Sequence, residues 1–140
     1  RKAREVGITA PFLGGDGWDS EELPKIAGAA INGNYFSNHY AADEDRAEVK
    51  DFVAKYKAEH GQTADGLAAL GYDAARVLFD AMERAKSLDG KDLRDAIAAT
   101  KDFTGVTGTF SIDENRNAKK SAVVVQYKDG KQTMAARIAP

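Results

Sequence analysis

The chain has 140 residues and a mass of 15.0 kDa, and its 20 basic and 22 acidic side chains leave a formal charge of −2 at pH 7. The length suits one domain, the composition of 43% hydrophobic and 30% charged residues indicates a globular protein, and the balanced charge argues against nucleic-acid binding. The absence of cysteine excludes disulfides, thiolate nucleophiles and cysteine-based zinc sites. No stretch approaches the ~20 apolar residues that a bilayer span requires.

The first residues, Arg1–Gly7, are typical of the last turn of a helix, with basic residues and a glycine at its C-terminal end. Because a helix entered midway implies preceding residues, we expect this chain to be a piece of a longer protein. Ile8–Gly15 then predicts a short buried strand. Asp19 or Ser20 can cap the helix that follows, which we expect to end near Gly33.

The middle of the chain is predicted to be mostly helical. Asn34–Tyr40 predicts a second strand, and the order helix, strand, helix, strand is typical of a parallel α/β sheet. Helices are then expected over Asp43–His60, Asp65–Lys86 and Lys91–Thr100. The first two carry apolar stripes at helical spacing, formed by Val49, Phe52, Val53 and Tyr56 and by Leu67, Leu70, Ala74, Val77, Leu78, Ala81 and Met82.

The last third of the chain changes to strands. Val106–Ile112 predicts one strand, and Asp113–Asn117 is a polar turn. Ser121–Tyr127 is a β-branched run, and the Asp-Gly pair at 129–130 predicts a hairpin into Lys131–Ile138. We therefore expect antiparallel strands at the C-terminal end.

The loop Gly14–Asp19 is the strongest candidate for a binding site. It joins a predicted strand to a helix, where α/β proteins bind ligands, and its glycines allow a ligand to approach the backbone. Asp16 offers an anion suited to an ammonium group, and Trp18 offers a flat apolar wall. A tight turn whose carboxylate accepts nearby N–H groups is an equally good interpretation. Phosphate binding is rejected, because the glycine spacing is wrong and Asp16 would repel a phosphate.

Gly71 and Tyr72 stand inside a predicted helix, where a glycine costs about 1 kcal/mol relative to alanine. Either a neighbouring helix packs closely there, which the local pattern favours, or a ligand lies under the ring of Tyr72. A calcium loop at 113–124 is rejected, because Ala118 and Val124 stand where glycine and glutamate are needed. No nucleophile elbow and no metal-ligand set is recognised, so we expect no cofactor and no metal.

Five segments have an order and spacing that together resemble one known family: Phe12–Asp19, Ala30–Phe36, Leu70–Ala74, Phe103–Gly108 and Phe110–Asp113. They resemble the C-terminal portion of periplasmic branched-chain amino-acid binding proteins, the type I solute-binding components of ABC importers. The resemblance covers about residues 1–130. It implies part of a type I periplasmic-binding-protein fold, an α/β fold of flavodoxin- or Rossmann-like layers, with a parallel sheet, flanking helices and C-terminal antiparallel strands.

The family has two α/β lobes joined by three hinge strands, and it closes on an amino acid held between them. The resemblance implies that residues 1–140 form one incomplete α/β unit that crosses between lobes near 36–42 and 118–122. It also implies that Asp16 receives the ligand's α-ammonium and that Tyr72 faces the same cleft from the opposite lobe. Trp18 would border the ligand side chain, and the contacts to the α-carboxylate would come from the preceding half.

The expected function is capture of Leu, Ile, Val or a related amino acid in the periplasm or outside the cell, with delivery to an ABC permease. Catalysis and nucleic-acid binding are not expected, and no signal segment is recognised in the chain. A ligand-sensing receptor domain of the same fold is an alternative, and an α/β enzyme with an unrecognised carboxylate site is a third. Because neither lobe would be whole, we expect the chain to self-associate or to pair with a missing N-terminal half.

Overall fold

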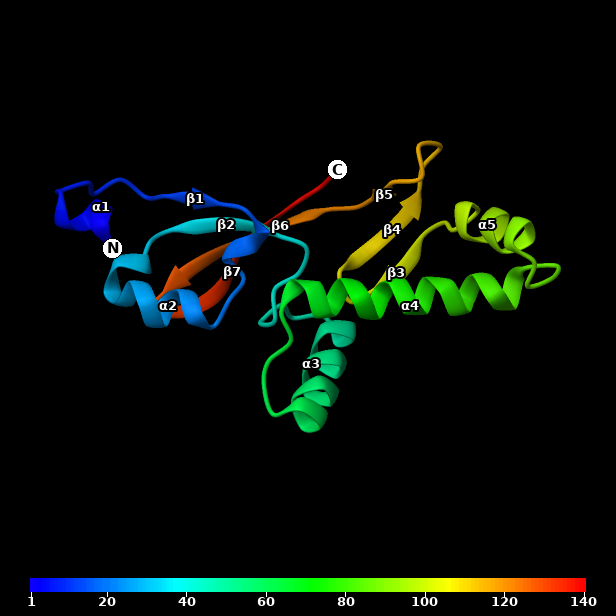
Figure 1. The fold of residues 1–140 in the computed structure, drawn as a ribbon, viewed down its shortest axis with the longest axis horizontal. Coiled ribbons are helices and arrows are strands. Elements are labelled where there is room, and N and C mark those ends of the chain that lie inside the picture. Colours follow the sequence, from blue (N-terminus) through cyan, green and yellow to red (C-terminus); the bar gives the residue numbers. More distant parts are fainter.

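The computed structural model describes residues 1–140, and it places two small sheets in different halves of an elongated molecule (Figure 1). We call residues 1–38 and 122–140 the four-stranded part and residues 47–119 the helical part. No helix combines the length and the hydrophobicity that crossing a membrane would need. The two ends of the chain both belong to the four-stranded part, so the helical part is inserted within it.

The four-stranded part contains one sheet in the order β1-β2-β6-β7. β1 pairs with β2 in parallel, and β6 pairs with both β2 and β7 in antiparallel orientation, which confirms the predicted combination. The bounds are α1 Lys2–Glu5, β1 Leu13–Gly14, η1 Asp16–Trp18, α2 Glu22–Ala27, η2 Gly28–Ile31, β2 Tyr35–Asn38, β6 Ala122–Lys128 and β7 Lys131–Ile138.

The core of this part forms because β6 alternates with the period of a strand. Val123, Val125 and Tyr127 are fully buried, whereas the residues between them are partly exposed. Phe36 of β2 packs beside Tyr127, with 5.5 Å between the ring centroids. The partly buried side chains that pack against this core come from η1, α2 and β7: Trp18, Leu23, Ala27 and Met134.

Two predictions for the four-stranded part are wrong. The strand expected over Ile8–Gly15 is limited to β1, and Leu13 is 81% exposed, because β1 is an edge strand whose outer face has no covering element. The helix expected to continue to Gly33 is interrupted at Gly28. The positive φ of Gly28, 58°, ends α2, and the chain continues as a short 3-10 turn.

The helical part contains three helices and a sheet in the order β3-β4-β5. Asp65 caps the long helix α4 by accepting the N–H of Ala68 at 2.7 Å, and Gly61 ends α3 with a φ of 73°. One buried hydrophobic cluster includes Tyr40 from the preceding segment, and its other members are Val49, Phe52, Ala64, Ala69 and Val106. The bounds are α3 Ala47–His60, α4 Gly66–Arg84, α5 Gly90–Ala98, β3 Phe103–Gly105, β4 Gly108–Ile112 and β5 Ala118–Lys119.

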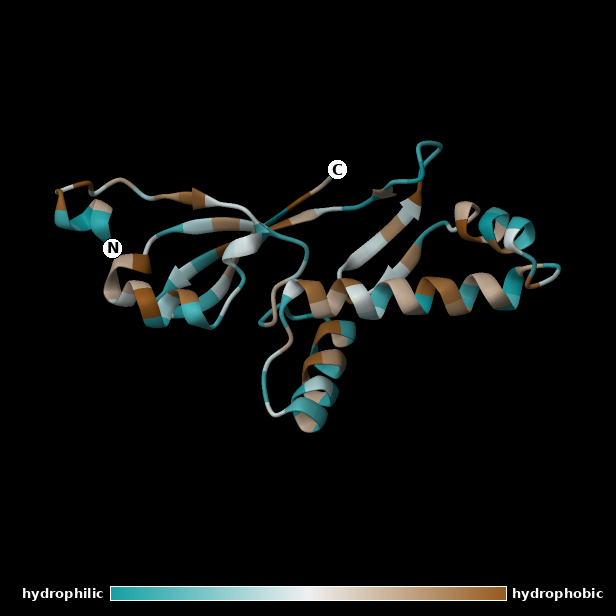
Figure 2. Cartoon of the chain, in the orientation of Figure 1, coloured by the Kyte–Doolittle hydropathy of each residue, from teal (hydrophilic) through white to brown (hydrophobic).

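Three predictions for the helical part need correction. The acidic residues at 43–45 precede α3 instead of opening it. The single strand expected over Val106–Ile112 is a hairpin, because the chain turns at Val106 and Thr107 and β3 starts at Phe103. The buried stripe of α4 is also displaced: Ala69, Asp73, Val77 and Ala81 are buried, whereas Leu67, Leu78 and Met82 are exposed. Figure 2 shows apolar residues at successive turns of α4.

Two short connections join the parts, residues 39–46 between β2 and α3 and residues 120–121 between β5 and β6. The first is held at both ends. The hydroxyl of Tyr40 donates to the carbonyl of Ala64 at 2.7 Å, and Arg137 of β7 forms two hydrogen bonds to one oxygen of Glu44, at 2.7 and 3.0 Å. This connection is therefore packed against both parts.

Candidate functional site

The glycine-rich loop after β1 is built around the ring of Trp18. Gly14 has no room for a side chain, because a Cβ there would overlap the indole ring. Trp18 packs against the core of the four-stranded part, and its carbonyl oxygen accepts the hydroxyl of Tyr127 at 2.7 Å. The indole therefore supports the loop from beneath, and it does not line the pocket that contains Asp16.

Asp16 begins η1 and points into a pocket of about 130 Å³ between the two parts. Its side chain is 58% exposed, and one carboxylate oxygen lies 3.5 Å from Nε2 of His39. Across the pocket is the first turn of α4, which contributes Gly66 and Leu67. Leu67 is 72% exposed. The lining of the pocket thus combines the exposed carboxylate of Asp16 with the exposed apolar side chain of Leu67, and it also includes Asp19 and Asp65.

Asp19 connects the loop to α4. Its Oδ2 atom accepts the N–H of Gly66 at 2.6 Å and the side-chain amide of Asn38 at 2.9 Å. Asn38 is itself buried, and its Oδ1 accepts the N–H of His39 at 2.8 Å. This arrangement forms the wall between the pocket of Asp16 and a second, larger pocket, since Asp19 and Asn38 line both.

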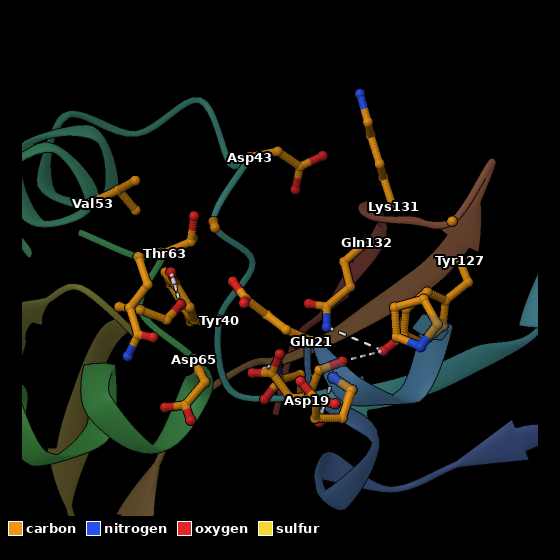
Figure 3. A pocket seen from close by; sticks show the side chains of 18 of the residues that line it. Asp19, Glu21, Tyr40, Asp43, Val53, Thr63, Asp65, Tyr127, Lys131 and Gln132 are labelled. Atoms are coloured by element: carbon orange, nitrogen blue, oxygen red, sulfur yellow. Dashed lines mark hydrogen bonds between the residues drawn. The ribbon is translucent and has the colours of Figure 1, made fainter. Parts of the chain in front are cut away.

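The larger pocket has a volume of about 990 Å³ and lies between α2 and the β6–β7 turn on one side and the α3–α4 loop on the other. Figure 3 shows Asp19 and Glu21 between Tyr127 and Gln132 on one side and Tyr40 and Asp65 on the other. Five carboxylates line it against two lysines, so it is acidic: Asp19, Glu21, Glu22, Asp43 and Asp65, with Lys25 and Lys131.

The two tyrosines of this larger pocket act as hydrogen-bond donors. Burial raises the pKa of the Tyr40 hydroxyl strongly and raises the pKa of the Tyr127 hydroxyl as well. Both groups therefore stay protonated at neutral pH and donate to main-chain carbonyls. No group of three or more His, Asp or Glu side chains is arranged to hold a metal ion.

Tyr72 lies apart from Asp16. It lines neither of these two pockets, and its ring lies 5.0 Å from the ring of Phe52, with the guanidinium of Arg76 5.9 Å from its centroid. Nothing lies within 4 Å of the place where a Cβ on Gly71 would stand, so no neighbouring element packs closely at that glycine. The role of Tyr72 as a ligand contact stays a prediction.

Sequence reasoning missed three residues that the structure brings to this site. Neither His39 nor Asn38 belongs to a sequence motif that points to this site. Leu67 is part of the apolar stripe predicted for 65–86, because its spacing fits that stripe, and the stripe alone does not place it at a pocket. The useful signal was its place in the first turn of the helix, where fewer neighbouring turns cover a side chain.

Comparison with known proteins places the chain beside amino-acid binding proteins. The sequence model of the family described as "Periplasmic binding protein" matches residues 1–132. The Leu/Ile/Val-binding protein homolog 1 of Brucella suis is 32% identical over 130 residues, covering 91% of this chain and 34% of the relative. The leucine-, isoleucine-, valine-, threonine- and alanine-binding protein of Pseudomonas aeruginosa is 29% identical over 136 residues, 95% of this chain and 36% of the relative.

Solved structures agree with these sequence relatives. The leucine-binding protein LivK of Thermotoga maritima superposes with a TM-score of 0.90 at 42% identity, over 100% of this chain and 40% of that protein. The branched-chain amino-acid substrate-binding protein LivJ of Streptococcus pneumoniae, in complex with isoleucine, superposes with a TM-score of 0.86 at 33% identity, over 99% of this chain and 40% of that protein. The chain therefore spans between 34% and 40% of the length of these four proteins.

Proposed function

Because the chain belongs to the periplasmic binding protein family, we propose that it forms part of an extracytoplasmic protein that binds a branched-chain or related amino acid between two lobes and delivers it to an ABC importer. The names of its relatives support this ligand class, since they refer to leucine, to leucine, isoleucine and valine, or to branched-chain amino acids, and in one case also to threonine and alanine. We propose no catalytic activity. A ligand-sensing receptor domain would use the same site, and no observation favours it.

The observation that carries the proposal is the pairing of Asp16 with Leu67 across one pocket. An amino acid with an aliphatic side chain needs a fixed anion for its ammonium group and an apolar surface for its side chain. In this proposal Asp16 accepts the ammonium and Leu67 contacts the side chain. Trp18 holds the loop of Asp16 in place, and it is a less direct candidate for the border of the ligand side chain, because its indole does not line the pocket of Asp16. Tyr72 has weaker support, since its ring is held between Phe52 and Arg76.

We propose that residues 1–140 form an incomplete α/β unit of the two-lobed protein, with lobe crossings near 36–42 and 118–122, and that the α-carboxylate contacts come from outside it. The exposed apolar side chains of α4 support this, because such a surface favours association: Leu67, Leu78, Phe79 and Met82. The isolated chain should therefore self-associate or pair with the remainder of the protein. A monodisperse monomer in light scattering would contradict self-association.

The experiment is a titration with L-leucine, followed by calorimetry and by the fluorescence of Trp18, with D-leucine as the stereochemical control. Asp16→Ala should weaken binding by roughly 2–5 kcal/mol, because the ammonium would be left unpaired. The matched control is Asp51→Ala, which removes an exposed carboxylate from α3. Equal losses in the two variants would remove Asp16 from its proposed role. A chain that does not respond to L-leucine would show that essential contacts lie outside these 140 residues.

A further inference from the structure

Asp19 joins the two parts of the molecule at the edge of the pocket that contains Asp16. It follows η1 directly, and its N–H donates to the carbonyl of Asp16 at 2.9 Å, so the two carboxylates are held on one short turn. The Asp19 side chain then reaches out of the four-stranded part to the N–H of Gly66, at 2.6 Å, in the first turn of α4. The next residue on α4 is Leu67, which lines the same pocket as Asp16.

The glycine at position 66 fits this contact. A Cβ there would lie 2.5 Å from Oδ1 of Asn38 and 3.2 Å from Oδ2 of Asp19, so any side chain would push α4 away from the loop. The backbone of Gly66 does not need a glycine for its own conformation, since its φ lies outside the positive range. Glycine is also a poor residue for a helix. The close approach of the two parts therefore accounts for the glycine at position 66.

Two features stabilise the hydrogen bond between the Gly66 N–H and Asp19 when the two parts are in contact. The N–H of Gly66 is one of the unpaired donors of a helix start, and a carboxylate there is favoured by the helix dipole. The second hydrogen bond to Oδ2, from buried Asn38, fixes the carboxylate in the direction of α4. When the parts separate, water can hydrate both Asp19 and the helix end, so the contact can also open.

We propose that Asp19 is a positioning residue that holds the first turn of α4, and with it Leu67, against the loop of Asp16, so that this hydrogen bond stabilises the closed form of the binding pocket. The proposal rests on the proposed function, because it assigns to Asp19 the closure of the same site. Asp19 also lines the pocket, but both hydrogen bonds of its Oδ2 atom go to Gly66 and Asn38. Its effect on affinity passes through the orientation of the helical part relative to the four-stranded part.

Three variants separate this role from a general effect on stability. Asp19→Ala removes both hydrogen bonds, whereas Asp19→Asn keeps an oxygen that can accept both and loses only the charge. Gly66→Ala breaks the contact from the other side while making α4 a better helix. Asp113→Ala is the matched control, since Asp113 likewise accepts two hydrogen bonds on one carboxylate oxygen, from the N–H groups of Asn115 and Asn117, in a turn of the helical part.

The measurements are L-leucine affinity, amide exchange at Gly66, and residual dipolar couplings, which report how the two parts are oriented. Asp19→Ala should lower affinity by about ten- to a hundredfold, speed exchange at Gly66 and give the two parts different alignments. Asp19→Asn should lower the affinity for L-leucine only about two- to fivefold. Gly66→Ala should also bind at least about tenfold more weakly, although its thermal stability should not fall. Asp113→Ala should bind like the wild type.

The proposal is overturned if Asp19→Ala binds L-leucine as tightly as the wild type, or if Gly66→Ala does. If the wild-type chain binds no leucine, essential ligand contacts lie outside these 140 residues, and the ligand-free measurements decide the closure role alone. The closure role is then supported if Asp19→Ala exchanges faster at Gly66 and its two parts align separately, and if Asp19→Asn shows the wild-type exchange and alignment. Unchanged exchange and alignment in Asp19→Ala overturn it.

Discussion

The carboxylate of Asp73 accepts two hydrogen bonds from Thr107, one from its N–H and one from its hydroxyl, each 2.8 Å long. The N–H of Val106 donates to the other carboxylate oxygen at 2.8 Å. Asp73 is 2% exposed in the middle of α4, and a Cβ on Gly105 would overlap its carboxylate. This one side chain therefore fixes the β3–β4 turn against the helix.

Asp73→Ala should lower the free energy of unfolding by about 3 kcal/mol or more, because it leaves two main-chain N–H groups and a hydroxyl without an acceptor in a buried place. Thr107→Val removes only the hydroxyl and should cost about 1 kcal/mol. Urea denaturation of both variants tests the difference. A loss in Asp73→Ala no larger than that in Thr107→Val would contradict the proposed importance of the main-chain hydrogen bonds.

Asp73 also shows where prediction from the sequence stops. The helical period of α4 and the glycine that ends α3 are local signals, and the structure confirms a helix at both places. A buried carboxylate within an apolar stripe has no local signal, because its partners at Val106 and Thr107 lie 33 and 34 residues further along the chain. The displaced stripe of α4 follows from the same cause, since the hairpin that covers α4 is positioned by this contact.

In the candidate site, too, the sequence predicts what depends on neighbouring residues and misses contacts between distant ones. Asp16 was predicted from a glycine-rich loop after a strand, which is a pattern within a few residues. The contact of Asp19 with Gly66 joins residues 47 positions apart, and the sequence offered only a capping role for Asp19. The spacing of Leu67 matches the predicted apolar stripe, and only the packed structure identifies which side of α4 is left exposed.

Gly14 and Gly15 should respond differently to the same substitution. Gly14→Ala should destabilise the fold by about 1–3 kcal/mol, because the new Cβ overlaps the ring of Trp18 and must displace it. The fluorescence of Trp18 should shift to the red as the ring becomes more exposed. Gly15→Ala is the matched control: nothing lies within 4 Å of its Cβ position, and its φ of −95° suits alanine. Similar emission spectra in the two variants would contradict the packing of the ring against Gly14.

The ion pair between Glu44 and Arg137 should be important for the connection between the two parts. Arg137 makes three hydrogen bonds to the carboxylate of Glu44, whose side chain is 8% exposed. Arg137→Ala should cost about 3–5 kcal/mol, because it leaves a buried carboxylate unpaired. The exposed pair of Asp45 and Lys50 provides the control, and Lys50→Ala should leave thermal unfolding unchanged. Equal effects of the two substitutions would show that burial does not set the strength of the pair.

Lys120 should make stability depend on pH in the alkaline range. Its Nζ is buried without a hydrogen-bond partner beside a largely apolar pocket of about 320 Å³ that also contains Val77 and Phe110. Burial lowers the pKa of Lys120 from 10.5 to about 8, against the opposing attraction of Asp73. Between about pH 8 and 10.5 the unfolded chain therefore binds more protons than the folded chain, so the free energy of unfolding should rise with pH across this window.

Lys120→Met removes the buried amine and keeps its apolar stem. At pH 7 the amine is charged in both the folded and the unfolded chain. The variant should therefore be about 2 kcal/mol more stable than the wild type. This difference is smaller than the full pKa shift implies, because part of the Lys120 side chain is exposed. Urea denaturation at intervals from pH 7 to 10.5 measures both proteins. The advantage of Lys120→Met should shrink as pH rises, because the wild-type amine loses its charge. A constant difference between the two curves would mean that the amine is not desolvated in the folded chain.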